Sequence, residues 1–442
     1  MALSRRTLLA SGLAAAGAGL TSGCAGKPLD TLLNRAAQVP RTPATLTWWV
    51  SEIPSRNGPV VADLIIRAFE RRHPQIHVRK SNALSTTDSN RAAVTTQLAG
   101  ASPTPDVYLG DTTWPAQFGS NSLALPLQTL LPKDFWDGYP AALRRVSEYR
   151  GAVYALPFFT DSAFLYYRKD LLAKHGRPVP RTWEELVRTA RTVQRAGDAP
   201  YGFLWQGSVS ESLTCNVAEF LADAEAPVLD GAGRVALGGP GAERAFAMMR
   251  EFTETGVTPP TVGTYVEADS QDAFTGGRGV FLRNWSYAWG NAADRSVSKV
   301  AGRVGVAPRP GFAGDGPRGV SCAGGWSNFI NPNSRHLGAA VAFARFCAGE
   351  EAQMILLKNA GVIPALDEVL SRPQARAVGD PTLTGVRQLH LVARPVQSPY
   401  YPQVSKALYT RANAVIGGRT TPAQAVRAAR ADIRTALEGR AL

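Results

Sequence analysis

The segment TLTWWVS (residues 45–51) predicts a short β-strand, and the segment that follows it, NGPVVADLIIRAFERRHP (57–74), predicts an amphipathic helix. Pro74 ends this helix, because the residue before a proline avoids helical geometry. Three more segments continue the alternation as strand, helix and strand: IHVRKSN (76–82), SNRAAVTTQLAG (89–100) and PDVYLGD (105–111). This βαβαβ order with short turns predicts an α/β fold with a mainly parallel sheet covered by helices.

A second α/β block begins near YALPFFTDSAFLYYRKDLL (154–172). Its helix at 182–196 opens with a capping box, in which Thr182 and Glu185 satisfy each other's free backbone amides. The last helix opens in the same way at residues 421–424, with a proline at its first helical position. The two blocks are similar in kind but not in sequence, so no internal repeat is predicted.

The length of the chain, 442 residues, exceeds what one ordinary hydrophobic core holds and predicts two or three domains. A composition that is 45% hydrophobic and 19% charged is typical of a folded globular protein. Beyond the first residues, no apolar run is long enough to span a bilayer.

Residues 1–23 predict an export signal, with Arg5 and Arg6 ahead of an apolar run. The adjacent arginines resemble a twin-arginine signal. The sequence TSGC resembles a bacterial lipobox, in which cleavage exposes Cys24 for lipid attachment. A plain secretory signal and a buried amino-terminal helix are the alternatives. Residues 24–44 contain three prolines and no strong period, which predicts a tether between the lipid and the folded body.

The net charge is +13, or +11 without the two arginines of the signal. Proteins as basic as this often bind nucleic acid or anionic lipid. The densest basic set, Arg427, Arg430 and Arg434, lies at helical spacing and has no aromatic residues among it. We therefore interpret the charge as a solvated surface and expect no nucleic acid partner.

Catalytic and cofactor motifs are missing from the sequence. The five histidines are isolated and no phosphate-binding loop is present, so we expect neither a metal nor a cofactor. Cys215, Cys322 and Cys347 fit no zinc pattern, and either one disulfide or three buried thiols is compatible with their number. Asp111 and Asp161 are a candidate pair of glycosidase carboxylates, so a secreted glycoside hydrolase is the enzyme alternative.

Aromatic, carboxylate and amide side chains recur together where predicted strands end. Because ligands of open α/β sheets bind beyond the carboxyl ends of strands, we expect these residues to converge on one pocket. A sugar offers apolar faces to aromatic rings and hydroxyl groups to carboxylates and amides. The candidate binding residues are Ser51, Glu52, Asp111, Asp161, Trp205, Gln206, Trp285, Gly325, Trp326 and Tyr401.

Six stretches carry a resemblance to a known family. They are DVYLGDTTWPAQFGSNSLALPL (106–127), GAVYALPFFTDSAFLYYRKDLL (151–172), TWEEL (182–186), DAFTGGRGVFLRNWSYAW (272–289), GGWSNFINPNS (324–334) and SPYYPQVSKALYTRANAVIGGRTTPAQAV (398–426). In their order and spacing the chain resembles extracellular solute-binding proteins of family 1, the carbohydrate-binding components of ABC importers. The resemblance runs from about Thr45 to the carboxyl terminus. It implies a periplasmic-binding-protein type II fold, in which two α/β lobes, each with a mainly parallel sheet, close over the ligand.

The resemblance also places the boundaries of the lobes and of the hinges between them. The amino-terminal lobe would comprise residues 45–158 and 323–363, and the carboxy-terminal lobe residues 159–322 and 364–442. The three hinge segments implied by the family are residues 157–162, 321–325 and 361–366.

Individual residues match the family's ligand contacts. Ser51 and Glu52 match polar contacts after the first strand, and Asp161 matches an acidic hinge residue that binds sugar hydroxyls. Trp285 matches an aromatic platform, which we expect to be exposed in the cleft together with Tyr287, whereas Trp289 is expected in the core.

Further matches concern the glycine pair and the carboxy-terminal aromatic residues. Gly324 and Gly325 match a pair where the backbone approaches the ligand, with Trp326 at its edge. Leu408 and Tyr409 depart from the stacking pair of maltose-type proteins, and Tyr400 and Tyr401 are the candidates to replace it.

The predicted function is that of a monomeric, lipid-anchored binding protein on the outer face of the cytoplasmic membrane. It would deliver a sugar or sugar derivative to an ABC permease, and the acidic residues of the pocket suggest an amino sugar as a narrower hypothesis. A glycerophosphodiester is the alternative ligand, with Arg283 or Arg394 holding its phosphate.

Overall fold

The computed structural model describes residues 28–439 except 56–59, 85, 315–318 and 397. The predicted signal peptide and Cys24 lie outside the described residues. Within the described part of the chain, no helix combines the length and the apolar character that crossing a membrane requires.

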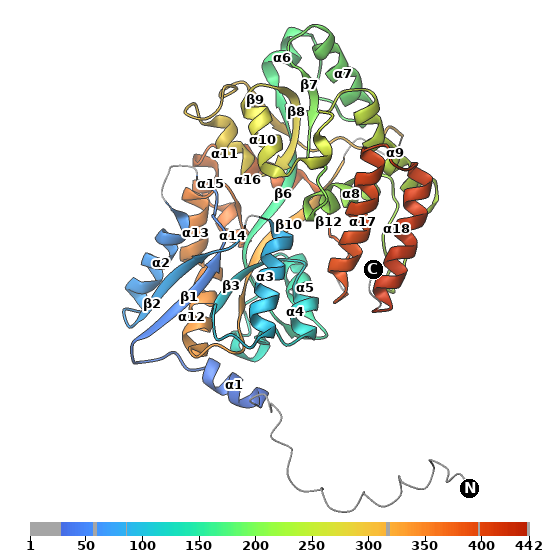
Figure 1. Ribbon diagram of the computed structural model, residues 1–442. Coiled ribbons are helices and arrows are strands. Elements are labelled where there is room, and N and C mark those ends of the chain that lie inside the picture. Colours follow the sequence, from blue (N-terminus) through green and yellow to red (C-terminus); the bar gives the residue numbers. More distant parts are fainter. Residues whose placement is uncertain (1–27, 56–59, 85, 315–318, 397, 440–442) are drawn as a thin grey trace, which may run out of the picture.

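The βαβαβ prediction for the first block is confirmed. Strands β1 (Ala44–Val50), β2 (Ile76–Asn82) and β3 (Val107–Asp111) pair in parallel in the order β2-β1-β3, with helices α2 (Val61–Arg72) and α3 (Thr87–Ala99) between them in sequence. Alternate residues of β1 are buried, which explains why its sequence was recognisable as a strand. These elements form the core of the amino-terminal lobe, at the lower left of Figure 1.

Two long strands connect this lobe to the second one. Strand β6 (Leu156–Arg168) and strand β10 (Val320–Ile330) pair antiparallel in the middle of a sheet with the order β2-β1-β3-β10-β6-β8-β7. They cross between the lobes in Figure 1. Up to Ser162, β6 pairs with β10; from Ala163 onward it pairs with β8.

The sheet of the carboxy-terminal lobe is mixed, which differs from the expectation of a mainly parallel sheet. Strands β7 (Tyr201–Leu204) and β8 (Gly279–Trp285) pair in parallel, as do the start of β10 and β12 (His390–Val392), whereas β6 runs antiparallel to β8 and to β9 (Val304–Ala307). The difference arises because β6 enters this sheet from the other lobe and is not the product of a local βαβ unit.

Helices cover both lobes, and the two predicted capping boxes are present. Thr182 caps α7 together with Glu185, and Thr421 caps α18 together with Gln424. Apart from α1, which is described below, the remaining α-helices of the described residues are α4 (Pro115–Ser120), α5 (Ala141–Ser147), α6 (Lys169–Lys174), α7 (Trp183–Arg195), α8 (Glu211–Asp223), α9 (Gly239–Glu254), α10 (Glu267–Thr275), α11 (Ala288–Ala293), α12 (Leu337–Ala348), α13 (Glu350–Asn359), α14 (Asp367–Ser371), α15 (Pro373–Ala377), α16 (Pro381–Gly385), α17 (Tyr401–Ile416) and α18 (Pro422–Leu437).

The remaining elements are short. They are the strands β4 (Glu148–Tyr149), β5 (Ala152–Val153), β11 (Ile363–Pro364) and β12 (His390–Val392), and the 3₁₀ helices η1 (Gln128–Leu130), η2 (Val262–Thr264) and η3 (Val386–Gln388).

Part of the predicted tether is structured, which corrects the assignment of residues 24–44. Helix α1 (Leu29–Ala36) lies at the base of the amino-terminal lobe in Figure 1 and packs against α12. Ala36 is buried, and a Cβ on Gly338 of α12 would come within 1.7 Å of the Gln38 carbonyl oxygen. The backbone after α1 therefore fits closely against the lobe.

All three cysteines of the described chain are free, buried thiols. Of the two alternatives left open by the sequence, the structure contains the thiols and not the disulfide. Cys215 on α8 and Cys322 on β10 lie in one small buried cluster that also contains Ala163 and Trp285. Burial in apolar surroundings accounts for the raised pKa of the Cys347 thiol.

Candidate functional site

A cavity of about 440 Å³ lies between segments of both lobes. The amino-terminal lobe contributes the residues after β1, the start of α3 and the end of β3, whereas the carboxy-terminal lobe contributes the starts of α8 and α10 and the end of β8. The crossing strands β6 and β10 line it as well. Seven of the ten predicted residues lie in its wall: Ser51, Glu52, Asp111, Asp161, Trp285, Gly325 and Trp326.

Arg394 links the two sides of the cavity. Its Nη2 donates to Asp111 Oδ1 at 2.9 Å, and its Nη1 donates to Glu211 Oε1 at 2.6 Å. Asp111 ends strand β3 of the amino-terminal lobe, whereas Glu211 begins helix α8 of the carboxy-terminal lobe. All three side chains are at least nine-tenths buried. Burial raises the pKa of Glu211, although the positive charge of Arg394 acts in the opposite direction.

A second contact between the lobes lies next to this arginine. Asp88 at the start of α3 accepts a hydrogen bond from the backbone amide of Glu211, with 2.8 Å between Oδ2 and N. A carboxylate at the amino-terminal end of a helix such as α8 is favourable, because the free amides there carry partial positive charge. Asp88 and Arg394 together join α3, β3 and α8 around one end of the cavity.

Asp161 lies on β6, next to Ser162, the last residue of this strand that pairs with β10. From Ala163 onward β6 pairs with β8. Its Oδ1 accepts hydrogen bonds from the amides of Ser162 at 2.8 Å and Ser286 at 2.9 Å. Burial raises the pKa of Asp161 to about 7, although these hydrogen bonds favour the charged form. The carboxyl group at the centre of the cavity wall therefore changes its charge near neutral pH.

The aromatic part of the cavity wall differs from the predicted platform. Trp285 is only 9% exposed: its Nε1 donates to Glu267 Oε1 at 3.2 Å, and the Arg283 guanidinium lies 4.5 Å from the ring centre. The expectation that this ring is widely exposed is therefore wrong, although its edge lines the cavity. Trp326 is half-buried and, of the two indoles, the more accessible to a ligand.

The glycine pair of β10, Gly324 and Gly325, lies in the cavity wall. A Cβ on Gly324 would come within 2.9 Å of the Trp285 ring, and a Cβ on Gly325 within 2.8 Å of the Phe159 carbonyl oxygen. Gly325 also has a φ of 143°, which side chains other than glycine rarely adopt. Because neither residue has a side chain, β10 can pack closely against Trp285 and Phe159, which line the cavity with it.

Two predicted residues lie behind the cavity and not in its wall. Trp205 is fully buried in the core of the carboxy-terminal lobe, where its Nε1 donates to Thr258 Oγ1 at 3.1 Å. Gln206 is also fully buried and accepts a hydrogen bond from Arg283 at 3.0 Å. Both follow strand β7, but the side chains at its end point into the lobe and not between the lobes.

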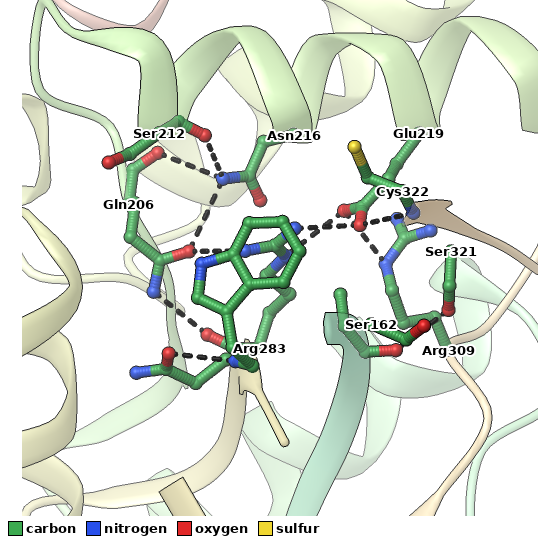
Figure 2. Close-up of polar contacts among 12 residues, drawn as sticks. Ser162, Gln206, Ser212, Asn216, Glu219, Arg283, Arg309, Ser321 and Cys322 are labelled. Carbon is green, nitrogen blue, oxygen red and sulfur yellow. Dashed lines mark hydrogen bonds and ion pairs between the residues drawn. The ribbon is translucent and has the colours of Figure 1, made fainter. Parts of the chain in front are cut away.

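In the polar network around Gln206, the positive and negative charges balance. Figure 2 shows Arg283 lying between Gln206 and Glu219, with Glu219 also next to Arg309. The two carboxylate oxygens of Glu219 accept from Arg283 at 2.7 and 3.0 Å, and Arg309 lies 3.2 Å from the same carboxylate and 3.5 Å from Asp223. Two guanidinium groups thus face two carboxyl groups, and the network carries no excess charge.

Tyr401, the third predicted residue outside the wall, is buried behind Glu211. Its hydroxyl group donates a hydrogen bond to Oε1 of that residue. Sequence reasoning missed three acidic residues of the wall: Asp88, Glu211 and Glu267. All three lie in the first turns of helices, a signal visible in the sequence. Arg394, considered from the sequence only as a phosphate ligand, also lies in the wall.

Comparison with known proteins agrees with this arrangement. Residues 54–354 match the family described as bacterial extracellular solute-binding protein. The chain belongs to this family. Since the match covers more than half of the chain and includes both crossing strands, the family resemblance inferred from the sequence is confirmed.

Several relatives of this solute-binding protein have been described. It is 29% identical over 352 residues to a probable ABC transporter-binding protein of Deinococcus radiodurans, a match that covers 77% of this chain and 82% of the relative. It is 25% identical over 316 residues to the mannitol-binding protein of Pseudomonas aeruginosa, which covers 70% of each chain. The structure of maltose-bound MalE3 of T. maritima is similar with a TM-score of 0.82 at 29% identity and covers 88% of this chain and 99% of the other.

The family assignment also decides between a binding protein and an enzyme. A solute-binding protein captures its ligand for transport and does not transform it, so the glycoside hydrolase alternative is wrong. The site agrees with this, because Asp111, one of the two candidate catalytic carboxylates, is held by Arg394 through both of its oxygens.

Proposed function

We propose that this solute-binding protein is exported, attached to the membrane through Cys24, and binds a sugar or sugar derivative for an ABC permease. The cavity supports a sugar ligand because it combines rings that suit the apolar faces of a sugar with acceptors for its hydroxyl groups. The relatives named for mannitol and maltose point to the same class of ligand. The twin-arginine and lipobox features of the sequence support export and anchoring.

The observation that carries a narrower proposal is the charge of the cavity. Six carboxyl groups line it, from Glu52, Asp88, Asp111, Asp161, Glu211 and Glu267, against the single guanidinium of Arg394. Arg394 pairs with two of the six, and Arg91 lies 3.7 Å from Asp88. Glu52, Glu267 and, in its ionised form, Asp161 leave the site with a net negative charge. A ligand with an ammonium group, such as an amino sugar, would be attracted to this site by Coulomb forces.

The same charge disfavours a glycerophosphodiester. Of the two arginines considered for its phosphate, Arg283 is held behind the wall by Glu219 and Gln206. Arg394 is in the wall, but a phosphate there would have to compete with the carboxylates of Asp111 and Glu211. Both arginines are thus already paired with side chains of the protein itself.

The proposed mechanism is closure of the two lobes, residues 45–158 with 323–363 and residues 159–322 with 364–442, over the ligand. The three proposed hinge segments are neighbours in one sheet, because β11 and β10 both pair with β6 around Thr160. Backbone rotation in three adjacent strands would move one lobe as a body. The change of partner along β6 after Ser162 lies at the end of the proposed hinge segment 157–162 and supports a hinge there.

A thermal-shift and calorimetry panel tests this proposal on the chain from Ala25 onward. The ligands are neutral monosaccharides and disaccharides, mannitol, the matching amino sugars and glycerophosphocholine. A ligand at a hundred times its Kd stabilises the folded state by about 2.7 kcal/mol. We expect an amino sugar to stabilise the protein more than its neutral counterpart does. Stabilisation by glycerophosphocholine alone would refute the charge argument, and no stabilisation by any sugar would refute the function.

Two variants test whether the ligand binds in this cavity. Trp326→Ala removes an accessible ring and should weaken all sugars, whereas Glu267→Gln removes one negative charge and should weaken amino sugars selectively. The matched control is Glu243→Gln, which removes the same charge from an exposed position on α9 and should leave every Kd unchanged.

A further inference from the structure

A second charged surface lies away from the cavity, at the base of the amino-terminal lobe beside α1. A groove of about 780 Å³ runs along this helix, and its lining includes Arg35, Arg41, Arg335 and His336 but no acidic residue. On the other side of α1, a broader depression of about 1010 Å³ contains Arg345 in its wall, and its far part contains Arg72 and Lys358 together with Glu350 and Glu351. We call the four arginines nearest α1 and the groove, Arg35, Arg41, Arg335 and Arg345, the basic face.

The arginines of the basic face are not neutralised by neighbouring residues. Arg41, Arg335 and Arg345 are exposed, and none of the four lies within ion-pair distance of a carboxylate in the described part of the chain. Arg35 donates to the carbonyl oxygen of Arg335 at 3.2 Å, which places two of the arginines side by side. The basic face therefore offers several free guanidinium groups to an anionic partner.

Exposed apolar side chains lie at the two ends of α1, and one of them, Val39, lines both the groove and the depression. Leu29, at the first position of α1, is 52% exposed, and Val39, just after the helix, is 46% exposed. Surfaces that combine basic and apolar residues on one side suit the interface of an anionic lipid bilayer, where the charges meet headgroups and the apolar groups enter between them.

The position of the basic face along the chain agrees with such a partner. Cys24, the proposed site of lipid attachment, precedes Pro28 by four residues, which span at most about 14 Å when fully extended. A lipid on Cys24 would therefore hold α1 and the groove close to the bilayer. Because α1 packs against the lobe, the folded body would be held there as well and not on a long flexible tether.

We infer that the basic face binds the anionic phospholipid surface of the membrane and orients the amino-terminal lobe on it. This inference goes beyond the proposed function, since it concerns a surface that makes no contact with the ligand cavity. It uses the proposed anchor as support but needs no lipid on Cys24 to be tested, because the electrostatic attraction acts on the unmodified chain too.

Vesicle flotation with the chain from Ala25 onward tests the inference. All the described helices and strands lie after this residue, and thermal unfolding of each variant verifies that it is folded. We expect binding to vesicles with equal parts phosphatidylglycerol and phosphatidylcholine, little binding to pure phosphatidylcholine, and release in 0.5 M salt. In the variant R41E/R335E/R345E, binding should fall by at least about tenfold, since each basic residue near an anionic surface contributes several-fold to affinity.

The matched control is R188E/R191E/R195E. These three exposed arginines lie on α7, at the opposite end of the molecule in Figure 1, so this variant has the same net charge. We expect it to bind vesicles as the unmodified chain does. Equal loss in both variants would show attraction by net charge alone and overturn the inference, as would binding that neither variant changes. Because no sugar is present, these outcomes are independent of the ligand panel.

Discussion

Replacing Asp161 with asparagine should remove much of the pH dependence of stability in the unliganded protein. Asp161 is only 7% exposed, and it accepts hydrogen bonds from the backbone amides of Ser162 and Ser286, which an asparagine carbonyl can also accept. The substitution thus keeps the shape and these contacts but removes the ability to ionise. Burial raises the pKa of Asp161 to about 7, from an ordinary value of 3.8.

The direction in which stability changes with pH follows from the raised pKa of Asp161. Folding favours the protonated carboxyl group, so the contribution of Asp161 to stability is fully present below pH 3.8 and is lost as the pH rises through 7. The separation of the two pKa values corresponds to a loss of roughly 4 kcal/mol in the free energy of unfolding by pH 8. Wild type and Asp161→Asn should therefore be similarly stable near pH 4, and the variant should be the more stable one at pH 8.

Urea unfolding between pH 4 and pH 8 measures this difference. Asp223 also has a pKa raised by burial, to about 6, but it is present in both proteins and cancels from their difference. The control is Asp294→Asn, because hydrogen bonds from Ser296 lower the pKa of this exposed residue and the difference from wild type should be constant above pH 5. Identical pH profiles of wild type and Asp161→Asn would refute the assignment.

Three further predictions concern the cavity. If the ammonium group of an amino sugar pairs with Asp161, its affinity measured by calorimetry should rise up to about tenfold per pH unit from pH 5 to 7 and then level off, and a neutral sugar should not show this rise. Arg394→Met leaves Asp111 and Glu211 buried without their partner and should lower the free energy of unfolding by about 3–5 kcal/mol, a loss that replacing both acids by amides should largely reverse. Gly325→Ala forces a side chain into a strained φ against a carbonyl oxygen and should cost about 1–3 kcal/mol, whereas Gly231→Ala, with open space around it, should cost little.

Much of the fold was predictable because its signals are local. Apolar periodicity, prolines and capping boxes indicated the βαβαβ block and the helices α7 and α18. The mixed sheet of the second lobe was not predictable in this way, since the direction of β6 relative to β8 depends on where the crossing strand comes from. Helix α1 was missed although Leu29, Leu32, Leu33 and Ala36 have helical spacing, because the surrounding prolines dominated the interpretation.

The site was predicted in part for a similar reason. Sequence shows where a strand ends but not which side of the sheet its last side chains face. Asp111 and Asp161 face the cavity, whereas Trp205 and Gln206, at an equally suggestive strand end, face the core. The partners of a charge are also not visible in a sequence: Glu211 and Arg394 are 183 residues apart, and only the fold brings them together.

Two sets of charges in this protein, a buried one behind the cavity and one that lines the cavity wall, differ in a way that bears on the ligand. Behind the cavity, Arg283 and Arg309 balance Glu219 and Asp223, as burial of charge requires. In the wall, six carboxyl groups face one guanidinium. Such an imbalance is unfavourable unless protons or a cation offset it. The pKa of Asp161, raised by burial to about 7, lets a proton offset part of this charge near neutral pH in the unliganded protein. A cationic ligand would take over this role, so its binding should release protons, and proton release measured in buffers of different ionisation enthalpy would distinguish it from a neutral sugar.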